Sequence, residues 1–358
     1  MIEARIASID TSAPERIAPR CPLFTVCGGC DYQHAPYDYQ LARKVEIVRE
    51  VCRRVGRFDA PAEIRVVAGE PWAYRNRVQF HIHGYRIGYR QVESHRLIHV
   101  EGECPIAAPA INHALSELRK VLRHRRWPGF VRSLELFTNG AVTLLNVLET
   151  DARQRVARPF FDWIAGHIPG ASRGELDYEA AGRLYRVSHE SFFQTNRFLI
   201  DALVDEALRQ AGGQAALELY AGVGLFTLPL AARVAHVDAV ESSASAARDL
   251  EFNLERAGLA ANAHRINAES YLANLRSAPD FVLADPPRSG LGKAVVAELI
   301  RLTPARMTLV SCDPSTQARD LAGLLAAGYT LRELVLVDLF PQTYHIETVA
   351  HLVTEPRP

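Results

Sequence analysis

Hydrophobic and polar positions follow two different periods along this chain. Near the N-terminus apolar residues recur every third or fourth position, which predicts an amphipathic helix over 38–56. Residues 64–150 instead alternate in short runs, as strands do, and Asn139-Gly140 marks a hairpin turn between two of them. A second helix is expected over 108–126. The apolar stripe of the first helix consists of Leu41, Val45, Val48, Cys52 and Val55.

From about residue 198 the pattern changes to helical stretches separated by short apolar runs. Strands that alternate with helices are typical of a doubly wound α/β fold with a mostly parallel sheet. We therefore predict a β-rich α+β region over 1–190 and a Rossmann-like domain over 191–358, on which the helix at 38–56 is a candidate to dock. Five strands are expected, within 215–224, 236–241, 280–287, 306–312 and 331–340.

Composition is that of an ordinary globular protein, with 358 residues, 48% hydrophobic and 23% charged. A formal net charge of zero argues against a protein coated in positive charge but allows a local basic face. Basic and aromatic residues mix over 74–91 and 119–132, which makes both stretches candidates for nucleic-acid contact, with solvated surface as the alternative. No signal core or bilayer-length apolar run stands out, so we expect a cytoplasmic protein without a membrane partner.

A glycine turn follows the first strand of the α/β half. Gly222 and Gly224 are positioned to let the backbone approach a ligand closely. Glu241 ends the next strand, about 20 residues further on, where an acid can accept hydrogen bonds from ribose hydroxyls. The dinucleotide-binding motif has a third glycine at the position that Thr227 occupies here. The turn therefore favours S-adenosylmethionine (SAM) over NAD as the ligand. A purely structural turn is the alternative.

Three polar or reactive residues stand at strand ends or within apolar patterns. Asp285 follows an apolar strand and opens an Asp-Pro-Pro loop, a motif associated with methyltransferases that act on bases. Cys312 ends another strand, a position that faces the ligand crevice and favours a nucleophile over a buried core thiol. Glu347 lies in an apolar strand pattern, so it must be paired or serve as an acid or base. His345 is interpreted as a structural histidine.

The chain resembles the SAM-dependent RNA (uracil-5-)-methyltransferases, which include bacterial 23S rRNA and tRNA 5-methyluridine enzymes. The resemblance implies a class I methyltransferase domain. It also implies that Cys312 is the nucleophile, that Glu347 is the base, and that RNA is the partner. The matching stretches are "CPLFTVCGGCDYQH", "YRNRVQFH", "ESFFQTN", "LELYAGVGLFTLPLA", "LADPPRSGL", "SCDPSTQARDL" and "FPQTYHIETV", between residues 21 and 349. The implied SAM contacts are Gln194, Tyr220, Glu241, Asn267 and Asp285.

The resemblance also interprets a cluster of cysteines. Cys21, Cys27 and Cys30 are spaced as in the rRNA branch of the family, and Cys104 matches its fourth ligand. Spacing alone leaves iron–sulfur and zinc open. The resemblance implies a [4Fe–4S] cluster, to which we assign a structural role. Cys52 is interpreted as a core residue, with a spare ligand as the alternative. Only 20 residues precede Cys21, too few for the N-terminal TRAM domain of many relatives.

The expected activity is methylation of carbon 5 of a uridine through a covalent cysteine adduct, with 23S rRNA favoured over tRNA and no obligate protein partner. One alternative is methylation of tRNA uridine 54. Another is a base methyltransferase acting on cytosine or on an exocyclic amine, and an amine enzyme needs no nucleophile. The last is a non-enzymatic metal-containing RNA-binding protein with a degenerate methyltransferase fold.

Overall fold

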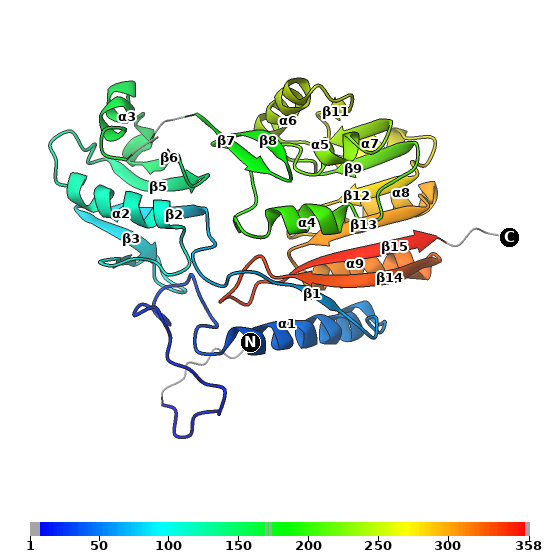
Figure 1. Ribbon diagram of the computed structural model, residues 1–358, viewed down its shortest axis with the longest axis horizontal. Coiled ribbons are helices and arrows are strands. Elements are labelled where there is room, and N and C mark those ends of the chain that lie inside the picture. Colours follow the sequence, from blue (N-terminus) through cyan, green and yellow to red (C-terminus); the bar gives the residue numbers. More distant parts are fainter. Residues whose placement is uncertain (1–7, 169–170, 172–173, 355–358) are drawn as a thin grey trace.

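The computed structural model describes residues 8–168, 171 and 174–354, and it contains a large and a smaller sheet side by side (Figure 1). No helix in these ranges has both the length and the apolar character needed to cross a membrane. The large sheet has the order β1-β14-β15-β13-β12-β9-β10-β11. Its strands are β1 Arg65–Val67, β9 Ala215–Leu219, β10 His236–Val240, β11 Asn262–His264, β12 Phe281–Ala284, β13 Arg306–Ser311, β14 Tyr329–Val337 and β15 Glu347–Thr354.

The large sheet confirms the doubly wound α/β prediction. Only β15 runs antiparallel to its neighbours, and all five expected strands are present. Two edge strands, β1 and β11, did not stand out in the sequence. Because β1 pairs in parallel with β14, residues on both sides of the expected boundary at 190 contribute to this one sheet.

Two apolar cores cover the two faces of the large sheet. Along β12, Phe281 and Leu283 point into one core, and Val282 and Ala284 point into the other. The first core takes residues from α4 Ile200–Ala207, α5 Thr227–Ala231 and α6 Ala244–Ala257. The second core takes residues from α1 Tyr37–Val51, α7 Ala268–Asn274, α8 Gly292–Leu302 and α9 Pro314–Ala326.

The first helix differs from its prediction at its C-terminal end. α1 continues into a π-helical turn, Cys52–Gly56, which rotates the later residues away from the apolar stripe. Cys52 is buried in the second core, as expected, whereas Val55 is 46% exposed and was wrongly placed in the stripe. The helix and its π-turn lie against α9, which packs on the large sheet.

A buried ion pair fastens α1 to the end of β14. The Lys44 Nζ donates to Asp338 Oδ1 at 2.6 Å and to the Phe340 carbonyl at 2.9 Å, and the side chains of Lys44 and Asp338 are almost fully buried. Removing one partner of such a pair leaves an uncompensated buried charge. We expect Lys44→Ala to lower the free energy of unfolding by about 3–5 kcal/mol, measured by urea denaturation.

The matched control for this prediction is Lys120→Ala. Lys120 is exposed and pairs with Glu117 one helical turn away, so its loss is expected to change stability by at most about 0.5 kcal/mol. Equal denaturation midpoints for the two variants would contradict the role assigned to the Lys44–Asp338 pair.

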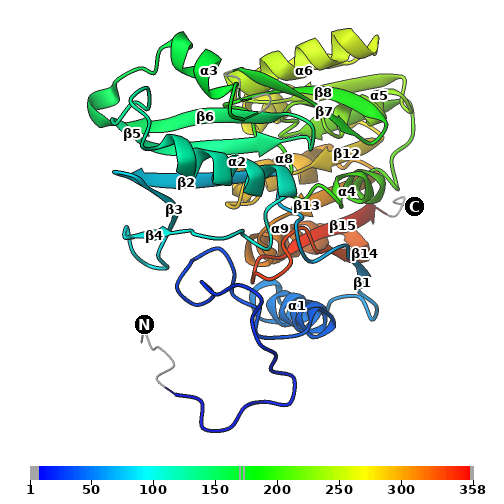
Figure 2. The ribbon, with the colours of Figure 1, turned by 60° about the vertical axis from the view of Figure 1, so that its left-hand side comes forward.

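The smaller sheet is antiparallel, in the order β4-β3-β2-β5-β6, with two helices packed on one face (Figure 2). The expected Asn139-Gly140 turn joins β5 and β6. The helix expected over 108–126 ends at Val121. The elements of this region are β2 Arg77–His83, β3 Arg86–Arg90, β4 Leu97–His99, α2 Pro109–Val121, β5 Val131–Thr138, β6 Thr143–Thr150, a short 3-10 turn Asp151–Arg153, and α3 Arg158–Ile164.

A separate hairpin, β7 Glu175–Ala180 and β8 Arg183–Ser188, leads from the smaller sheet to the large one. The hairpin packs against α6, where Arg186 forms an ion pair with the buried Asp249 at 2.9 Å. The same carboxylate accepts a hydrogen bond from Ser191 Oγ, in the loop that carries Gln194. The hairpin thus fixes that loop against the large sheet.

Candidate active site and cysteine cavity

Three of the expected site residues directly follow parallel strands of the large sheet, at the carboxyl ends of β9, β10 and β12. Leu219 at the end of β9 is in register with Val240 on β10 and with Ala284 on β12. The next residues along these strands are Tyr220, Glu241 and Asp285. Because parallel strands present their carboxyl ends together, these side chains belong to one crevice, the usual ligand site of such sheets.

The glycine turn after β9 leaves room for a ligand. Tyr220, Gly222 and Gly224 all have positive φ, at +63°, +58° and +93°. A side chain added at Gly222 would meet no atom within 4 Å, so open space lies against the backbone there. Glu241 anchors the turn, because its Oε2 accepts from Gly222 N at 2.8 Å and its Oε1 accepts from Ser243 N at 2.6 Å.

Two other expected SAM contacts have visible structural roles. Asn267 caps α7, accepting from Ser270 N at 2.7 Å. Gln194 is buried in the loop before α4, and its backbone carbonyl accepts from the Asn76 amide at 3.1 Å. That bond joins the Gln194 loop to the residue before β2, so the smaller sheet contacts the loop that carries Gln194.

Cys312 and Glu347 meet at the same edge of the large sheet. Ser311 on β13 pairs with Thr348 on the antiparallel β15, so Cys312 and Glu347 occupy the next opposed positions. Cys312 is half-buried, and Glu347 is only 4% exposed. A thiol and a carboxylate that are 35 positions apart in the sequence thus stand side by side at the crevice.

Burial and mutual charge shape the acidity of these groups. Burial, Glu347 and Asp285 together raise the pKa of Cys312 to about 11, and Arg288 opposes the shift. Burial and Asp285 also hold the pKa of Glu347 well above its usual range. Burial raises the pKa of Asp285 itself to about 7. The crevice therefore concentrates acids that bind protons tightly, beside one arginine.

Glu218 is a buried acid at the end of β9, next to the glycine turn, and the sequence analysis did not single it out. Burial raises its pKa to about 8, and its Oε2 accepts from Thr227 Oγ1 at 2.6 Å. Its other oxygen has no hydrogen-bond partner in the described part of the chain. Asp285 and Glu241 lie close enough to raise its pKa further. This unpartnered buried oxygen is available for a hydrogen bond with a ligand or a water.

Arg288 was also not singled out, although it stands three residues after Asp285 in the Asp-Pro-Pro loop. It is exposed, lies near Cys312 and Glu347, and approaches His345 Nδ1 at 3.4 Å. Burial and neighbouring cations, Arg288 first, lower the pKa of His345 to about 4, so this histidine is neutral. Its neutral ring beside Arg288 is compatible with the structural role expected for it.

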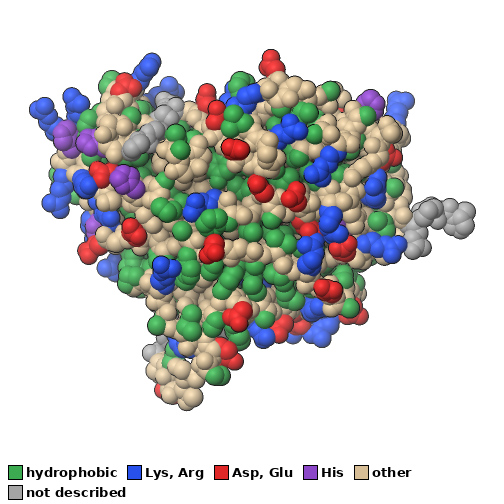
Figure 3. All heavy atoms as spheres, viewed as in Figure 1, with side chains coloured by type: hydrophobic (Ala, Val, Ile, Leu, Met, Phe, Trp, Pro, Cys, Tyr) green, Lys and Arg blue, Asp and Glu red, His purple; other side chains and the backbone are tan. Residues whose placement is uncertain are grey.

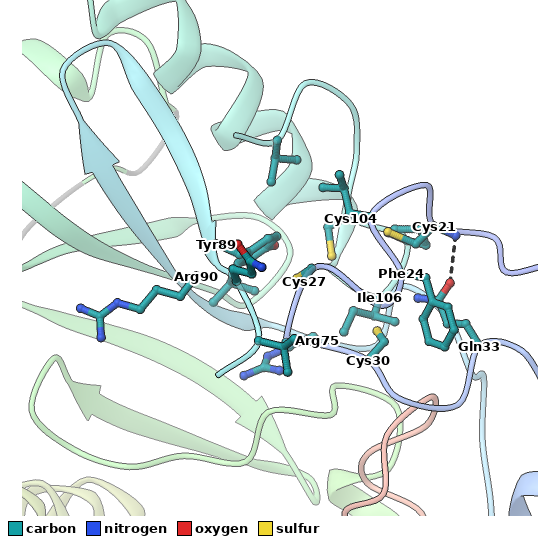
Figure 4. A pocket seen from close by; sticks show the side chains of 18 of the residues that line it. Cys21, Phe24, Cys27, Cys30, Gln33, Arg75, Tyr89, Arg90, Cys104 and Ile106 are labelled. Atoms are coloured by element: carbon teal, nitrogen blue, oxygen red, sulfur yellow. Dashed lines mark hydrogen bonds between the residues drawn. The ribbon is translucent and has the colours of Figure 1, made fainter. Parts of the chain in front are cut away.

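The four expected cysteine ligands line a single cavity of about 420 Å³ (Figure 4). Cys21, Cys27 and Cys30 belong to the loop before α1, and Cys104 comes from the segment between β4 and α2. Asn112 holds the last of these segments, accepting from Cys104 N at 2.9 Å and donating to its carbonyl at 3.0 Å. The fold therefore brings together the whole cysteine set that the sequence proposed.

The donor chemistry of this cavity suits a metal group. Four thiols that line one cavity can hold either an iron–sulfur cluster or zinc. In the described part of the chain, no three His, Cys, Asp or Glu side chains are placed so that they could hold a single metal ion as they stand.

The cysteine loop also contacts the segment that leads to Glu347. Asp31 N and Tyr32 N donate to the Gln342 carbonyl at 2.8 and 3.0 Å. Gln40 and Gln342 exchange two further bonds, each 3.1 Å, and both side chains are almost fully buried. The N-terminal region therefore helps to fix the loop between β14 and β15.

Comparison with known proteins identifies the family to which the chain belongs. The family model described as tRNA (Uracil-5-)-methyltransferase matches residues 173–355, which include Cys312 and Glu347. The chain belongs to the RNA (uracil-5-)-methyltransferase family. It is a SAM-dependent enzyme of that family, as the resemblance implied, and its catalytic domain has the class I methyltransferase fold.

Individual relatives act on two kinds of RNA. The chain is 32% identical to a 23S rRNA (uracil(1939)-C(5))-methyltransferase of Halomonas elongata, covering 97% of this chain and 79% of the relative. The corresponding enzyme of Edwardsiella ictaluri is 33% identical, with 97% and 84% covered. The structure of Pyrococcus abyssi tRNA (uracil-54, C5)-methyltransferase with S-adenosyl-L-homocysteine superposes with a TM-score of 0.75 at 26% identity, covering 97% of this chain and 88% of that one.

Proposed function

We propose that this enzyme methylates carbon 5 of a uridine in 23S rRNA through a covalent adduct with Cys312. The opposed placement of Cys312, directly after β13, and Glu347, at the start of β15, is the observation that carries the mechanism. The curated rRNA relatives, at 32–33% identity over nearly the whole chain, support the choice of RNA. Methylation of tRNA uridine 54 is the second candidate, supported by the Pyrococcus abyssi structure.

The proposed reaction begins at the sulfur of Cys312. The thiol releases its proton to solvent, and the thiolate adds to carbon 6 of uracil, which turns carbon 5 into the nucleophilic end of an enolate. Carbon 5 takes up the methyl group of SAM, which leaves as S-adenosyl-L-homocysteine. Glu347, as a carboxylate, then removes the remaining carbon-5 proton, and the electron pair left behind expels the sulfur from carbon 6. The double bond and the free cysteine are both restored.

SAM is proposed to bind at the open space against the backbone of Gly222. Gly222 and Gly224 let the backbone come close, and Glu241 is placed to accept from the ribose. Asp285 closes the crevice on the side of Cys312. Tyr220, Asn267 and Gln194 complete the proposed contact set. The burial of Asp285 and its raised pKa suit it to donate, as well as accept, a hydrogen bond at pH 7.

We further propose that Cys21, Cys27, Cys30 and Cys104 bind a [4Fe–4S] cluster with a structural role. No step of the reaction above needs an electron. The cluster would tie the loop before α1 to the segment after β4, and that loop in turn contacts Gln342. Anaerobically purified protein should then contain about four iron and four sulfide per chain.

Replacing one ligand tests the cluster proposal. Cys30→Ser is expected to lose most of the iron, the sulfide and the visible absorption. Cys52→Ala is the matched control, because Cys52 lies in the apolar core and should leave the iron content unchanged. About one zinc per chain with no sulfide, or equal iron loss in both variants, would contradict the assignment.

Nucleoside analysis tests the choice of RNA. Transcripts of 23S rRNA and of tRNA are incubated with the enzyme and SAM, digested, and analysed by mass spectrometry. The proposal expects 5-methyluridine in the rRNA alone and at a single position. Methylation confined to the tRNA would replace the rRNA proposal with the second candidate.

A further inference from the structure

The smaller sheet has a polar face opposite the one covered by α2 and α3. Along β2 the residues Val78, Phe80 and Ile82 point into the core, whereas His81 and His83 alternate to the other side. A cavity of about 390 Å³ opens on this side. The basic side chains that line it are His81, His83, Arg86, Arg90, His95, Arg96 and Arg132.

Much of the positive charge in this groove is not neutralised. Arg90 lies 3.8 Å from Glu149, and Arg132 pairs with Asp151. Arg86 and Arg96 are exposed, and neither has a carboxylate partner within the described ranges. A concave surface with unpaired arginine forks is suited to phosphate, which accepts two parallel hydrogen bonds from each fork.

The groove is connected to the active site by β2 itself. At the start of that strand, Arg77 donates to the Ser191 carbonyl at 2.8 Å, in the loop that carries Gln194. From Arg77 to His83 the strand extends by six residues, or about 20 Å. An RNA strand or stem held at the crevice therefore carries several phosphates within reach of the groove.

We propose that this groove, lined by Arg86, Arg96 and their basic neighbours, binds backbone phosphates of the substrate RNA at a distance from the methylated uridine. The proposal rests on RNA as the substrate in the function proposed above. The groove holds the RNA in position and takes no part in the chemistry at Cys312. Its contacts are with the phosphate backbone, so it contributes affinity and register rather than base selectivity.

Salt-dependent binding tests the groove directly. Arg86→Ala/Arg96→Ala is compared with Arg54→Ala/Arg276→Ala, which removes the same charge from two exposed arginines elsewhere. RNA binding with S-adenosyl-L-homocysteine present is measured by anisotropy from about 50 to about 300 mM salt. Loss of two phosphate contacts should reduce the slope of log K against log salt by about 1.4–1.8. The dissociation constant should rise by about tenfold or more at the lowest salt.

Turnover separates a binding groove from a structural defect. The groove variant should show a higher KM for RNA, an unchanged kcat at saturating RNA and unchanged SAM affinity. A slope equal to that of the unaltered enzyme, or an equal change in the control variant, would overturn the proposal. The binding arm needs no methylation, so failure of the carbon-5 chemistry would leave its result intact and be recognised separately.

Discussion

Replacement of Cys312 by alanine should abolish methylation, by at least about 10⁴-fold, and leave SAM binding unchanged. Without the sulfur, carbon 5 of uracil is not nucleophilic enough to take up a methyl group. The glycine turn and Glu241 follow β9 and β10, and β12 separates these strands from β13, so SAM affinity should persist. Single-turnover assays at saturating RNA and a calorimetric SAM titration measure the two effects.

Cys52→Ala provides the control for this loss, because it removes a buried thiol from the same chain outside the crevice. Its activity should stay within about twofold of the unaltered enzyme. If Cys312→Ala kept turnover within tenfold of normal, the nucleophile would be another group. A methyltransferase acting on an exocyclic amine, which needs no nucleophile, would then be the better interpretation.

Glu347→Gln should stop the reaction after the methyl group has been transferred. Glutamine fills the same space but cannot accept the carbon-5 proton, so the methylated adduct remains attached to Cys312. The substitution also removes a group that raises the pKa of Cys312, so thiolate attack should not be impeded. We expect a SAM-dependent protein–RNA band that resists denaturing electrophoresis, and turnover reduced by about 10²–10⁴-fold.

Two further variants identify the source of that band. Cys312→Ala/Glu347→Gln should give none, and Glu251→Gln, which alters an exposed acid of α6, should turn over normally without a band. If Glu347→Gln itself gave no band and remained active, the proton would be removed by another group. Asp285, whose pKa is raised to about 7, is the nearest alternative.

The sequence predicted the catalytic sheet well because its strands carry strong local signals. The runs that end at Tyr220, Glu241, Asp285 and Cys312 are each apolar and bounded by polar or glycine residues. Once these strands are parallel, their carboxyl ends must share one edge. Cys312 and Glu347 are opposite each other only because β15 runs antiparallel to β13. The sequence pattern alone does not predict that direction.

Features that depend on distant partners could not be read from local patterns. β1 pairs with β14, 270 positions away, and only three of its residues take part. Nothing in the local pattern around Lys44 indicates burial, yet this residue is buried because Asp338 and the Phe340 carbonyl compensate its charge. Glu218 is a further example, because the apolar residues around it in the sequence do not indicate that it borders the crevice.

Release of tritium from carbon 5 of uracil tests the central claim most directly. RNA transcribed with uridine tritiated at carbon 5 is incubated with anaerobically purified enzyme, with and without SAM. Attack at carbon 5 predicts SAM-dependent release, equal to the methyl groups incorporated and absent in Cys312→Ala. Methyl incorporation into the RNA without tritium release would contradict the account, because the methyl group would then be on another atom.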